Sequence, residues 1–235
     1  MPIQWTTTGQ RALDQGIKVL VHGVSGAGKT TLIKTCPRPI IASAESGTLS
    51  IADANLPMTE ITSYEDLVDF YNFLISPNAN NFDTGVLDSV SEIAERILTK
   101  EKLKAKDPRQ AYGEMADRVI TLLRMFRDIP GKNIYFTCKT AMVPTPEGSV
   151  KWCPLMPGKQ LTGGVAYYFD EFFFLGIGET VDNTGKKVRY RYLQTQPTAQ
   201  YEAKDRSGAL DEIEPPDLTH IFNKIRNKVT LKPAA

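Results

Sequence analysis

The strongest constraint on this chain is a glycine-rich segment between a predicted strand and a predicted helix. Ile17 to His22 is a short run of mainly apolar and β-branched residues, and Gly23 to Thr30 fits the pattern G-x-x-x-x-G-K-[ST]. Such glycines let successive backbone N–H groups converge on phosphate oxygens at the N-terminus of a helix. The segment therefore predicts a strand, a phosphate-binding loop (P-loop) and a helix from Lys29 to Lys34.

The P-loop predicts a site for ATP and Mg²⁺. We expect Lys29 to reach the β- and γ-phosphates, acting as a catalytic residue, and the Thr30 hydroxyl to ligate the metal. A glycine turn without a ligand is the alternative, which the flanking strand and helix disfavour. The expected nucleotide-binding residues are Gly23, Val24, Ser25, Gly26, Ala27, Gly28, Lys29, Thr30 and Thr31.

Two carboxylates follow other predicted strands. Asp88 ends the apolar segment Thr84 to Asp88 and is expected to hold Mg²⁺ through water, a role compatible with the N-cap of the next helix. Glu45 follows the apolar run Pro39 to Ala44. A carboxylate there is expected to accept a proton from the water that attacks the γ-phosphate; a solvated loop glutamate is the alternative. Glu92, one helical turn after Asp88, is the second choice for this base.

Strands and helices alternate along most of the chain. Helical patterns begin at Ser63, Ser89 and Tyr112, and another strand covers Asn133 to Cys138. This alternation predicts an α/β fold with a mostly parallel central sheet and helices on both faces. After Thr140 the sequence becomes β-rich, which predicts a C-terminal β-hairpin extension. We expect one domain over residues 1–235, with an N-terminal arm at 1–16 and a flexible tail at 229–235.

The charge balance excludes a uniformly basic nucleic-acid binder. The chain has 28 Lys and Arg against 27 Asp and Glu, a net charge of +1, yet residues 96–132 hold ten cations against five acids. A local cluster of this kind can neutralise phosphates without reading sequence, although a solvated helix end is the equal alternative. The expected contacts here are Lys100, Lys102, Lys104, Lys106 and Arg109.

The segment Ala141 to Gly164 is the second candidate for binding nucleic acid. It is longer than most connections and carries Lys151, Trp152 and Lys159 among prolines and glycines, a mixture suited to backbone contacts and base stacking. A hairpin that packs Trp152 on the core is the alternative. No membrane segment or secretory signal is evident, and three cysteines lack metal-ligand spacing, so we expect a cytoplasmic protein.

In this order, the motifs resemble the ATPase core of the RecA family of recombinases. The resemblance rests on the P-loop, on Glu45, on Leu87-Asp88-Ser89-Val90 and on Thr162-Gly163-Gly164 before a short apolar segment. The compact length is similar to phage-encoded RecA-like proteins that promote single-strand annealing or strand exchange. A phage protein of this kind would work in the host cytoplasm.

The resemblance implies further residues and partners. A polar residue at the end of the Asn133 to Cys138 strand would sense the γ-phosphate, which makes Lys139 and Thr140 the candidates. Cations from a neighbouring subunit would contact the same phosphate, for which Arg191, Lys204 and Arg206 are the candidates. The implied partners are single-stranded DNA, further copies of the chain in a filament or ring, and a single-strand DNA-binding protein.

The resulting hypothesis is a Mg²⁺- and ATP-dependent ATPase that assembles on single-stranded DNA and promotes annealing or strand exchange in homologous recombination. Two alternatives stay open at this point. The first is a nucleotide or small-molecule kinase that shares the P-loop. The second is a nucleotide-dependent assembly or loader module with little catalysis.

Overall fold

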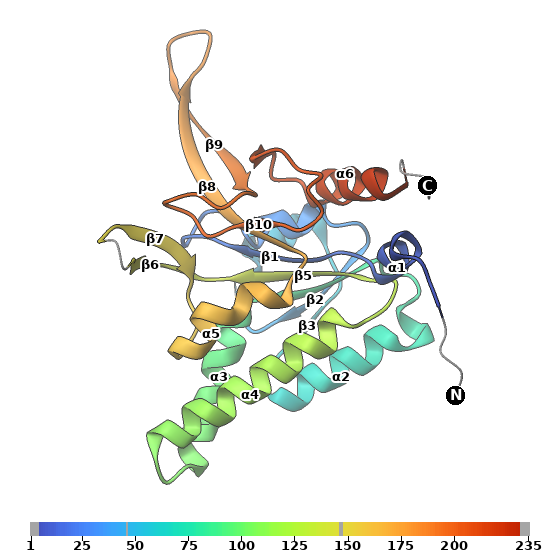
Figure 1. Ribbon diagram of the computed structural model, residues 1–235, viewed down its shortest axis with the longest axis vertical. Coiled ribbons are helices and arrows are strands. Elements are labelled where there is room, and N and C mark those ends of the chain that lie inside the picture. The colour runs from blue at the N-terminus through green and yellow to red at the C-terminus, as the bar shows by residue number, and fades with distance from the viewer. Residues whose placement is uncertain (1–4, 46, 146–147, 231–235) are drawn as a thin grey trace.

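The strands form one large sheet with a parallel centre (Figure 1). The computed structural model describes residues 5–45, 47–145 and 148–230, and within them nine strands belong to this sheet. From edge to edge the order is β11 (Ile213–Glu214), β9 (Lys187–Gln194), β8 (Glu171–Val181), β1 (Lys18–His22), β5 (Asn133–Cys138), β4 (Thr84–Asp88), β2 (Pro39–Ser43) and β3 (Met58–Glu60), with β10 (Lys204–Asp205) paired to β8.

The parallel pairs bring the predicted site residues to one edge of the sheet. β1 pairs in parallel with β5 and β8, and β5 pairs in parallel with β4. The carboxyl ends of these strands therefore lie together. The P-loop follows β1, Asp88 ends β4, and Glu45 lies two residues beyond β2.

Alternate side chains of the strands build a core on each face of the sheet. Leu20, Phe136 and Phe172 belong to one core, whereas Val19 and Tyr135 belong to the other. In Figure 1 the long helices lie below the sheet and α6 lies above it. The first face is covered by α2 (Tyr64–Ile75), α3 (Val90–Lys104), α4 (Pro108–Arg127), α5 (Lys159–Gly164) and the 3₁₀ helix η4 (Val165–Tyr168). The second is covered by α6 (Leu218–Thr230) and the 3₁₀ helices η1 (Thr31–Thr35) and η2 (Thr48–Ala54). A third 3₁₀ helix, η3 (Pro77–Ala79), follows α2.

The α/β class, the mostly parallel sheet and the C-terminal hairpin are as predicted. Local signals also placed the ends of several elements correctly. α2 begins after a capping box made by Ser63 and Asp66. α3 begins where expected, but its N-cap is Ser89 and not Asp88, because the Ser89 hydroxyl accepts from the Glu92 N–H. α4 begins at Pro108, one turn before the predicted start, because Asp107 caps it and proline is well suited to the first helical position.

Three elements differ from the prediction. The helix expected after the P-loop is only the short η1, because Pro37 and Pro39 follow it and a residue before proline is disfavoured in a helix. The expected N-terminal arm contains α1 (Thr8–Gln15), capped by Thr7. The sequence motifs did not predict α6, whose last two residues fall in the expected C-terminal tail. The rest of that tail, residues 231–235, and residues 1–4 of the expected arm lie outside the described part of the chain.

The segment predicted as a long connection after Thr140 contains regular structure. β6 (Thr140–Pro144) and β7 (Val150–Pro154) form a separate antiparallel hairpin, and α5 follows at Lys159. This hairpin is the alternative that the sequence left open for the segment.

Candidate nucleotide-binding site

The P-loop has the backbone conformation that its glycines permit. Gly26 and Gly28 have φ angles of 78° and 107°, values that disfavour residues with a Cβ atom. The Ala27 N–H closes a turn on the Val24 carbonyl at 3.2 Å, and the Leu32 N–H reaches the Gly28 carbonyl at 2.9 Å. A Cβ atom added to Gly26 would meet nothing within 4 Å, so the loop leaves open space at this glycine. The backbone therefore fits a phosphate-binding role.

Lys29 folds back over this loop. Its Nζ donates to the carbonyls of Gly23 and Val24 at 2.8 and 3.2 Å. Burial lowers the pKa of Lys29, while the carboxylates of Glu45 and Asp88 oppose that shift. The buried Tyr135 hydroxyl donates to the Lys29 carbonyl at 2.9 Å from the adjacent strand β5. Tyr135 thus fixes the end of the loop, a contact that the sequence motifs did not predict.

Asp88 receives a hydroxyl on each carboxylate oxygen. Thr30 Oγ1 donates to Asp88 Oδ2 at 3.0 Å, and Thr137 Oγ1 donates to Oδ1 from β5. Burial raises the pKa of Asp88, and these two hydrogen bonds act in the opposite direction. The Thr30 hydroxyl and the Asp88 carboxylate are hard oxygen ligands held side by side, which fits Mg²⁺ held by a hydroxyl, a carboxylate and water.

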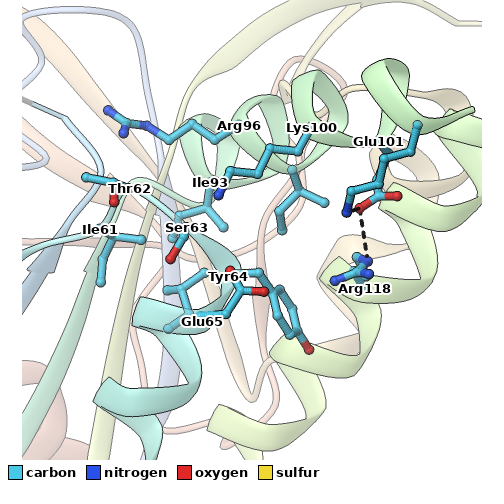
Figure 2. A pocket seen from close by; sticks show the side chains of 13 residues that line it. Ile61, Thr62, Ser63, Tyr64, Glu65, Ile93, Arg96, Lys100, Glu101 and Arg118 are labelled. Atoms are coloured by element: carbon cyan, nitrogen blue, oxygen red, sulfur yellow. Dashed lines mark hydrogen bonds and ion pairs between the residues drawn. The ribbon is translucent and has the colours of Figure 1, made fainter.

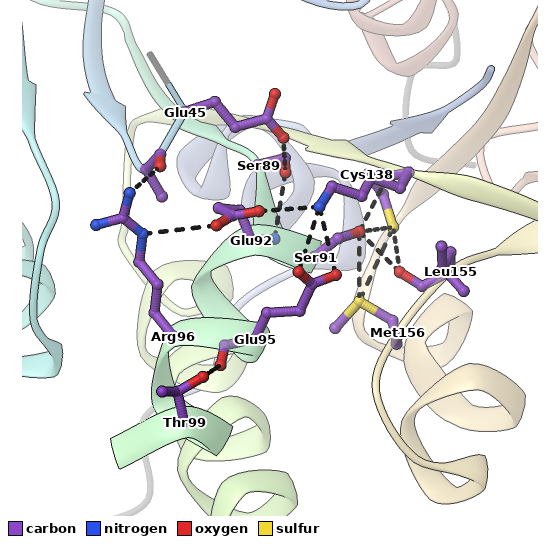
Figure 3. A network of polar contacts seen from close by, with 12 residues as sticks. Glu45, Ser89, Ser91, Glu92, Glu95, Arg96, Thr99, Cys138, Leu155 and Met156 are labelled. Carbon is purple, nitrogen blue, oxygen red and sulfur yellow. Dashed lines mark hydrogen bonds and ion pairs between the residues drawn. The ribbon is translucent and has the colours of Figure 1, made fainter. Parts of the chain in front are cut away.

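Glu45 lies next to this group and is tied to α3 in two ways (Figure 3). Ser89 Oγ donates to Glu45 Oε1, and Arg96 Nη2 donates to the neighbouring Ala44 carbonyl at 2.6 Å. Arg96 Nε is buried without a hydrogen-bond partner among the described residues, 3.8 Å from Glu92 Oε1. The base predicted from the sequence is therefore beside Lys29 and Asp88, and α3 holds the loop that carries it.

The two residues predicted to sense the γ-phosphate have other partners. Lys139 Nζ forms ion pairs with Glu92 and Glu95 at 2.9 and 3.3 Å, which also engages Glu92, the second choice for the base. Thr140 Oγ1 lies 3.0 Å from Nδ1 of His22 and donates to the Cys153 carbonyl at 2.8 Å. The β5 hydroxyl that contacts Asp88 belongs to Thr137, two positions before Lys139.

A family model described as an AAA domain matches residues 15–207. The chain belongs to the AAA domain family. This membership identifies a P-loop nucleotide-binding protein of an ATPase class, as the sequence predicted, while the narrower resemblance to phage recombination proteins stays a prediction. No curated protein matches the sequence. The matched range of the AAA domain contains every residue of the site described above and extends through β9.

Arg191 contacts the P-loop of the same AAA domain. Its Nε donates to the Ala27 carbonyl at 2.7 Å, and a Cβ on Gly28 would lie 2.9 Å from this nitrogen. The resemblance assigned Arg191 to a neighbour's phosphate, so the observed contact within one chain differs from that expectation. β8 pairs with β1, so the hairpin that carries Arg191 lies beside the loop.

The other two cations of that set are held at the opposite end of the strands. Lys204 Nζ donates to the carbonyls of Ala166 and Phe169 at 2.7 and 2.5 Å. Arg206 pairs with Asp170 at 3.0 Å, just before β8 begins. Both side chains have structural partners far from the P-loop, and this arrangement gives no support to a role at the γ-phosphate.

The predicted basic cluster lies at the tip of the α3–α4 helical pair. Lys100 and Lys104 line a pocket beside the start of α2, together with Arg96, Glu101 and Arg118 (Figure 2). Glu101 forms ion pairs with Arg118 at 3.3 Å and with Lys104 at 3.4 Å. The other three cations, Lys102, Lys106 and Arg109, are exposed, and Lys102 lies 5.4 Å from the centre of the Tyr112 ring. At 1.5 Å per residue, α3 separates this tip from Asp88 by about 20 Å.

The second predicted nucleic-acid segment is partly packed on the core. Trp152 is half-buried, and its ring centre lies 6.1 Å from that of Phe174. Lys151 is half-buried in the same strand, and the side chain of Lys159 lies outside the described part of the structure. Within residues 5–45, 47–145 and 148–230, each helix is too short or too polar to cross a bilayer.

Proposed function

We propose that this AAA domain hydrolyses ATP with Glu45 as the general base. The observation that carries the proposal is the meeting of Lys29, Thr30, Asp88 and Glu45 at the carboxyl edge of three strands. Lys29 would bind the terminal phosphates, and Glu45 would take a proton from water. Thr30 and Asp88 would hold Mg²⁺, which neutralises charge on the phosphate oxygens.

The position of Glu45 favours hydrolysis over transfer to another acceptor. A general base must reach the proton that it removes, and Glu45 is adjacent to the P-loop lysine while being held by Ser89. The described part of the 139–164 segment, where a kinase would need a basic lid, contains no arginine. Water is therefore the proposed acceptor.

We further propose that the ATPase acts on single-stranded DNA as an assembly of several copies, promoting annealing or strand exchange. The support is the exposed cation cluster at the α3–α4 tip, where five cations between Lys100 and Arg109 accompany only two acids. Such a cluster suits sequence-independent contact with phosphates. The resemblance to RecA-like proteins supports the same partner.

Phosphate release from ATP, measured with and without single-stranded DNA, tests both parts. Glu45→Gln should lower the rate by about 10²- to 10⁴-fold through loss of the base and leave nucleotide binding intact. Lys29→Ala should abolish nucleotide binding. The matched control is Glu60→Gln, because Glu60 is exposed on β3. Full turnover by Glu45→Gln would reject Glu45 as the base. Little turnover by the wild type, with assembly unchanged in Glu45→Gln, would favour the loader alternative, and transfer of phosphate to a small molecule would favour the kinase.

The DNA part has its own measurement. The Lys102→Glu, Lys106→Glu double variant should bind an oligonucleotide more weakly. The slope of log affinity against log salt should become shallower by about 0.7 for each phosphate that the variant no longer neutralises. Lys228→Glu is the matched control, because Lys228 is exposed on α6 at the other face of the sheet. Sedimentation with DNA and ATP reports assembly; a protein that stays a monomer and leaves DNA unbound contradicts this part.

A further inference from the structure

A two-stranded arm projects from the body of the molecule (Figure 1). It consists of Gly176 to Val181 in β8 and Lys187 to Tyr192 in β9, joined by an exposed turn. β11 pairs with β9 only at Leu193 and Gln194, so the described strands give the arm no third strand. Most of its residues are exposed although the arm continues the central sheet.

One face of this arm consists of tyrosines lying over glycines. Tyr190 is opposite Gly178, and Tyr192 is opposite Gly176. A Cβ on Gly178 would lie 2.5 Å from Cζ of Tyr190, and one on Gly176 would overlap the ring of Tyr192. The outer end of each ring, Cζ, Cε1 and Oη, therefore lies over a backbone that has no side chain. Tyr190 remains 47% exposed, so part of this aromatic face is accessible.

The aromatic row continues from the arm toward the β6–β7 hairpin. The ring centres of Tyr190 and Tyr192 are 6.0 Å apart, and burial together with the Tyr201 hydroxyl raises the pKa of Tyr192 to about 12. Tyr201 stacks on Phe174 at 4.4 Å, and Phe174 lies 6.1 Å from Trp152. The row thus connects the arm with the second segment that the sequence predicted to contact nucleic acid.

The charge of the arm complements a polyanion. Residues 176–192 contain four cations and two acids. Arg189 pairs with Glu179 at 3.2 Å, whereas Lys186, Lys187 and Arg191 have no carboxylate within 4.0 Å among the described residues. Because side chains alternate along a strand, Lys187 and Arg191 lie on the face of β9 opposite the tyrosines. The arm as a whole thus combines accessible aromatic rings, on which bases can stack, with surplus cations that attract the nucleic-acid backbone.

We propose that the tyrosine face of the arm, centred on Tyr190 and Tyr192, is a binding site for single-stranded nucleic acid. The proposal rests on the proposed function and adds to it a site on a different element from the α3–α4 tip. Stacking needs unpaired bases, because those of a duplex are already stacked inside it. The face should therefore prefer single strands to duplex.

The test uses fluorescence anisotropy of a labelled oligothymidylate of about 30 nucleotides, several times the length that one such site covers. Tyr190→Ala and Tyr192→Ala should each raise Kd at least about fivefold, whereas Tyr190→Phe should stay within about twofold of the wild type because it keeps the ring. Tyr167→Ala is the matched control, because Tyr167 is 80% exposed on η4. Equal Kd values for the alanine variants and the wild type would overturn the proposal, and so would a change of oligomeric state without a change of Kd.

Photo-crosslinking of an iodouracil-containing oligonucleotide to the wild type gives a readout that does not depend on a variant's folding. Mass spectrometry should locate the modified peptide at Tyr190 or Tyr192, and crosslinks confined to other segments would contradict the site. If the wild type binds no oligonucleotide at all, the proposed function fails together with this site. If the wild type binds and the alanine variants bind equally well, only the site on the arm fails.

Discussion

At the scale of single residues, the least expected member of the site is Thr137. It lies inside the buried strand β5, between Phe136 and Cys138. Its hydroxyl donates to the carboxylate of Asp88 at the end of the neighbouring strand β4. A donor to a carboxylate stabilises the ionised form that can bind a metal. Thr137 should therefore matter for hydrolysis although no motif in the sequence contains it.

Thr137→Val should lower the rate of ATP hydrolysis by about tenfold, because loss of a hydrogen bond to a charged group costs about 1.5–3 kcal/mol and further raises the pKa of Asp88. Thr137→Ser keeps the hydroxyl and should stay near the wild-type rate. Steady-state phosphate release against Mg²⁺ concentration is the measurement, since the valine variant should need more metal. Equal Mg²⁺ dependence of the two variants would contradict the role.

Some residues of the site could be predicted from the sequence and others could not, for a physical reason. Lys29 and Thr30 belong to a contiguous motif, and Asp88 and Glu45 each follow an apolar run, so local patterns locate them. Tyr135 and Thr137 act from a strand about a hundred residues after the P-loop. Their roles depend on which strand lies between β1 and β4, and local sequence does not encode that order.

At the scale of elements, local signals account for most of the helices and strands, including α6, which was missed although its signal is local. The ends of β4 and α3 follow from an apolar run and a serine cap. α6 has a clear apolar spacing at Leu218, Ile221, Phe222 and Ile225, which is a sufficient local signal for a helix. The contact of β9 with the P-loop has no local signal in the sequence, because it arises only when β8 pairs with β1.

The contact of Arg191 with the P-loop means that the two faces of β9 point to different candidate sites. Arg191 lies on the Ala27 carbonyl on one face, while Tyr190 and Tyr192 occupy the other. Side chains alternate across a strand, so a shift of β9 must move both faces together. We therefore expect the hairpin to couple nucleotide at the P-loop to the proposed nucleic-acid site on the arm.

Arg191→Ala should remove this coupling. In the wild type, we expect Kd for the oligothymidylate to differ at least about fivefold between ADP and a non-hydrolysable ATP analogue, a coupling free energy of about 1 kcal/mol. In the variant the two Kd values should become nearly equal. Arg189→Ala is the matched control, because Arg189 lies on the same face but pairs with Glu179; it should weaken binding in both states and preserve the ratio. A ratio that survives Arg191→Ala would refute the coupling.

At the scale of the whole molecule, the two ends of the sheet serve different purposes. The carboxyl edge holds the nucleotide site, and the other end holds buried ionisable groups. Glu171 there is 1% exposed; its Oε1 accepts from the Ser207 N–H at 3.2 Å, and its Oε2 has no hydrogen-bond partner among the described residues. Burial, reinforced by the nearby Asp205, raises the pKa of Glu171 to about 9.

This buried carboxyl makes the free energy of unfolding depend on pH. The folded protein keeps the Glu171 proton up to about pH 9, whereas the unfolded chain loses it near the ordinary value of 4.5. The folded state therefore binds more protons between these values, so stability falls as pH rises, by at most about 1.4 kcal/mol per pH unit. Buried cationic groups act in the opposite direction, because the folded state binds fewer of their protons. Burial lowers the pKa of His22 to about 4 and that of Lys18 to about 8. Burial also lowers the pKa of Lys29, Lys132 and Lys204.

Between pH 6.5 and 8, the difference in slope between the wild type and Glu171→Gln therefore reports Glu171, because the other titratable groups are present in both proteins. Urea unfolding of the wild type should show stability decreasing across this window, and Glu171→Gln, which carries no charge at any pH, should flatten the decrease. Glu60→Gln, at an exposed position, should keep the wild-type slope. Because Glu171 lies at the end of the strands opposite to the P-loop, Glu171→Gln should leave ATP hydrolysis at pH 7 unchanged. Equal slopes for Glu171→Gln and the wild type would show that this carboxyl is already ionised in the folded protein.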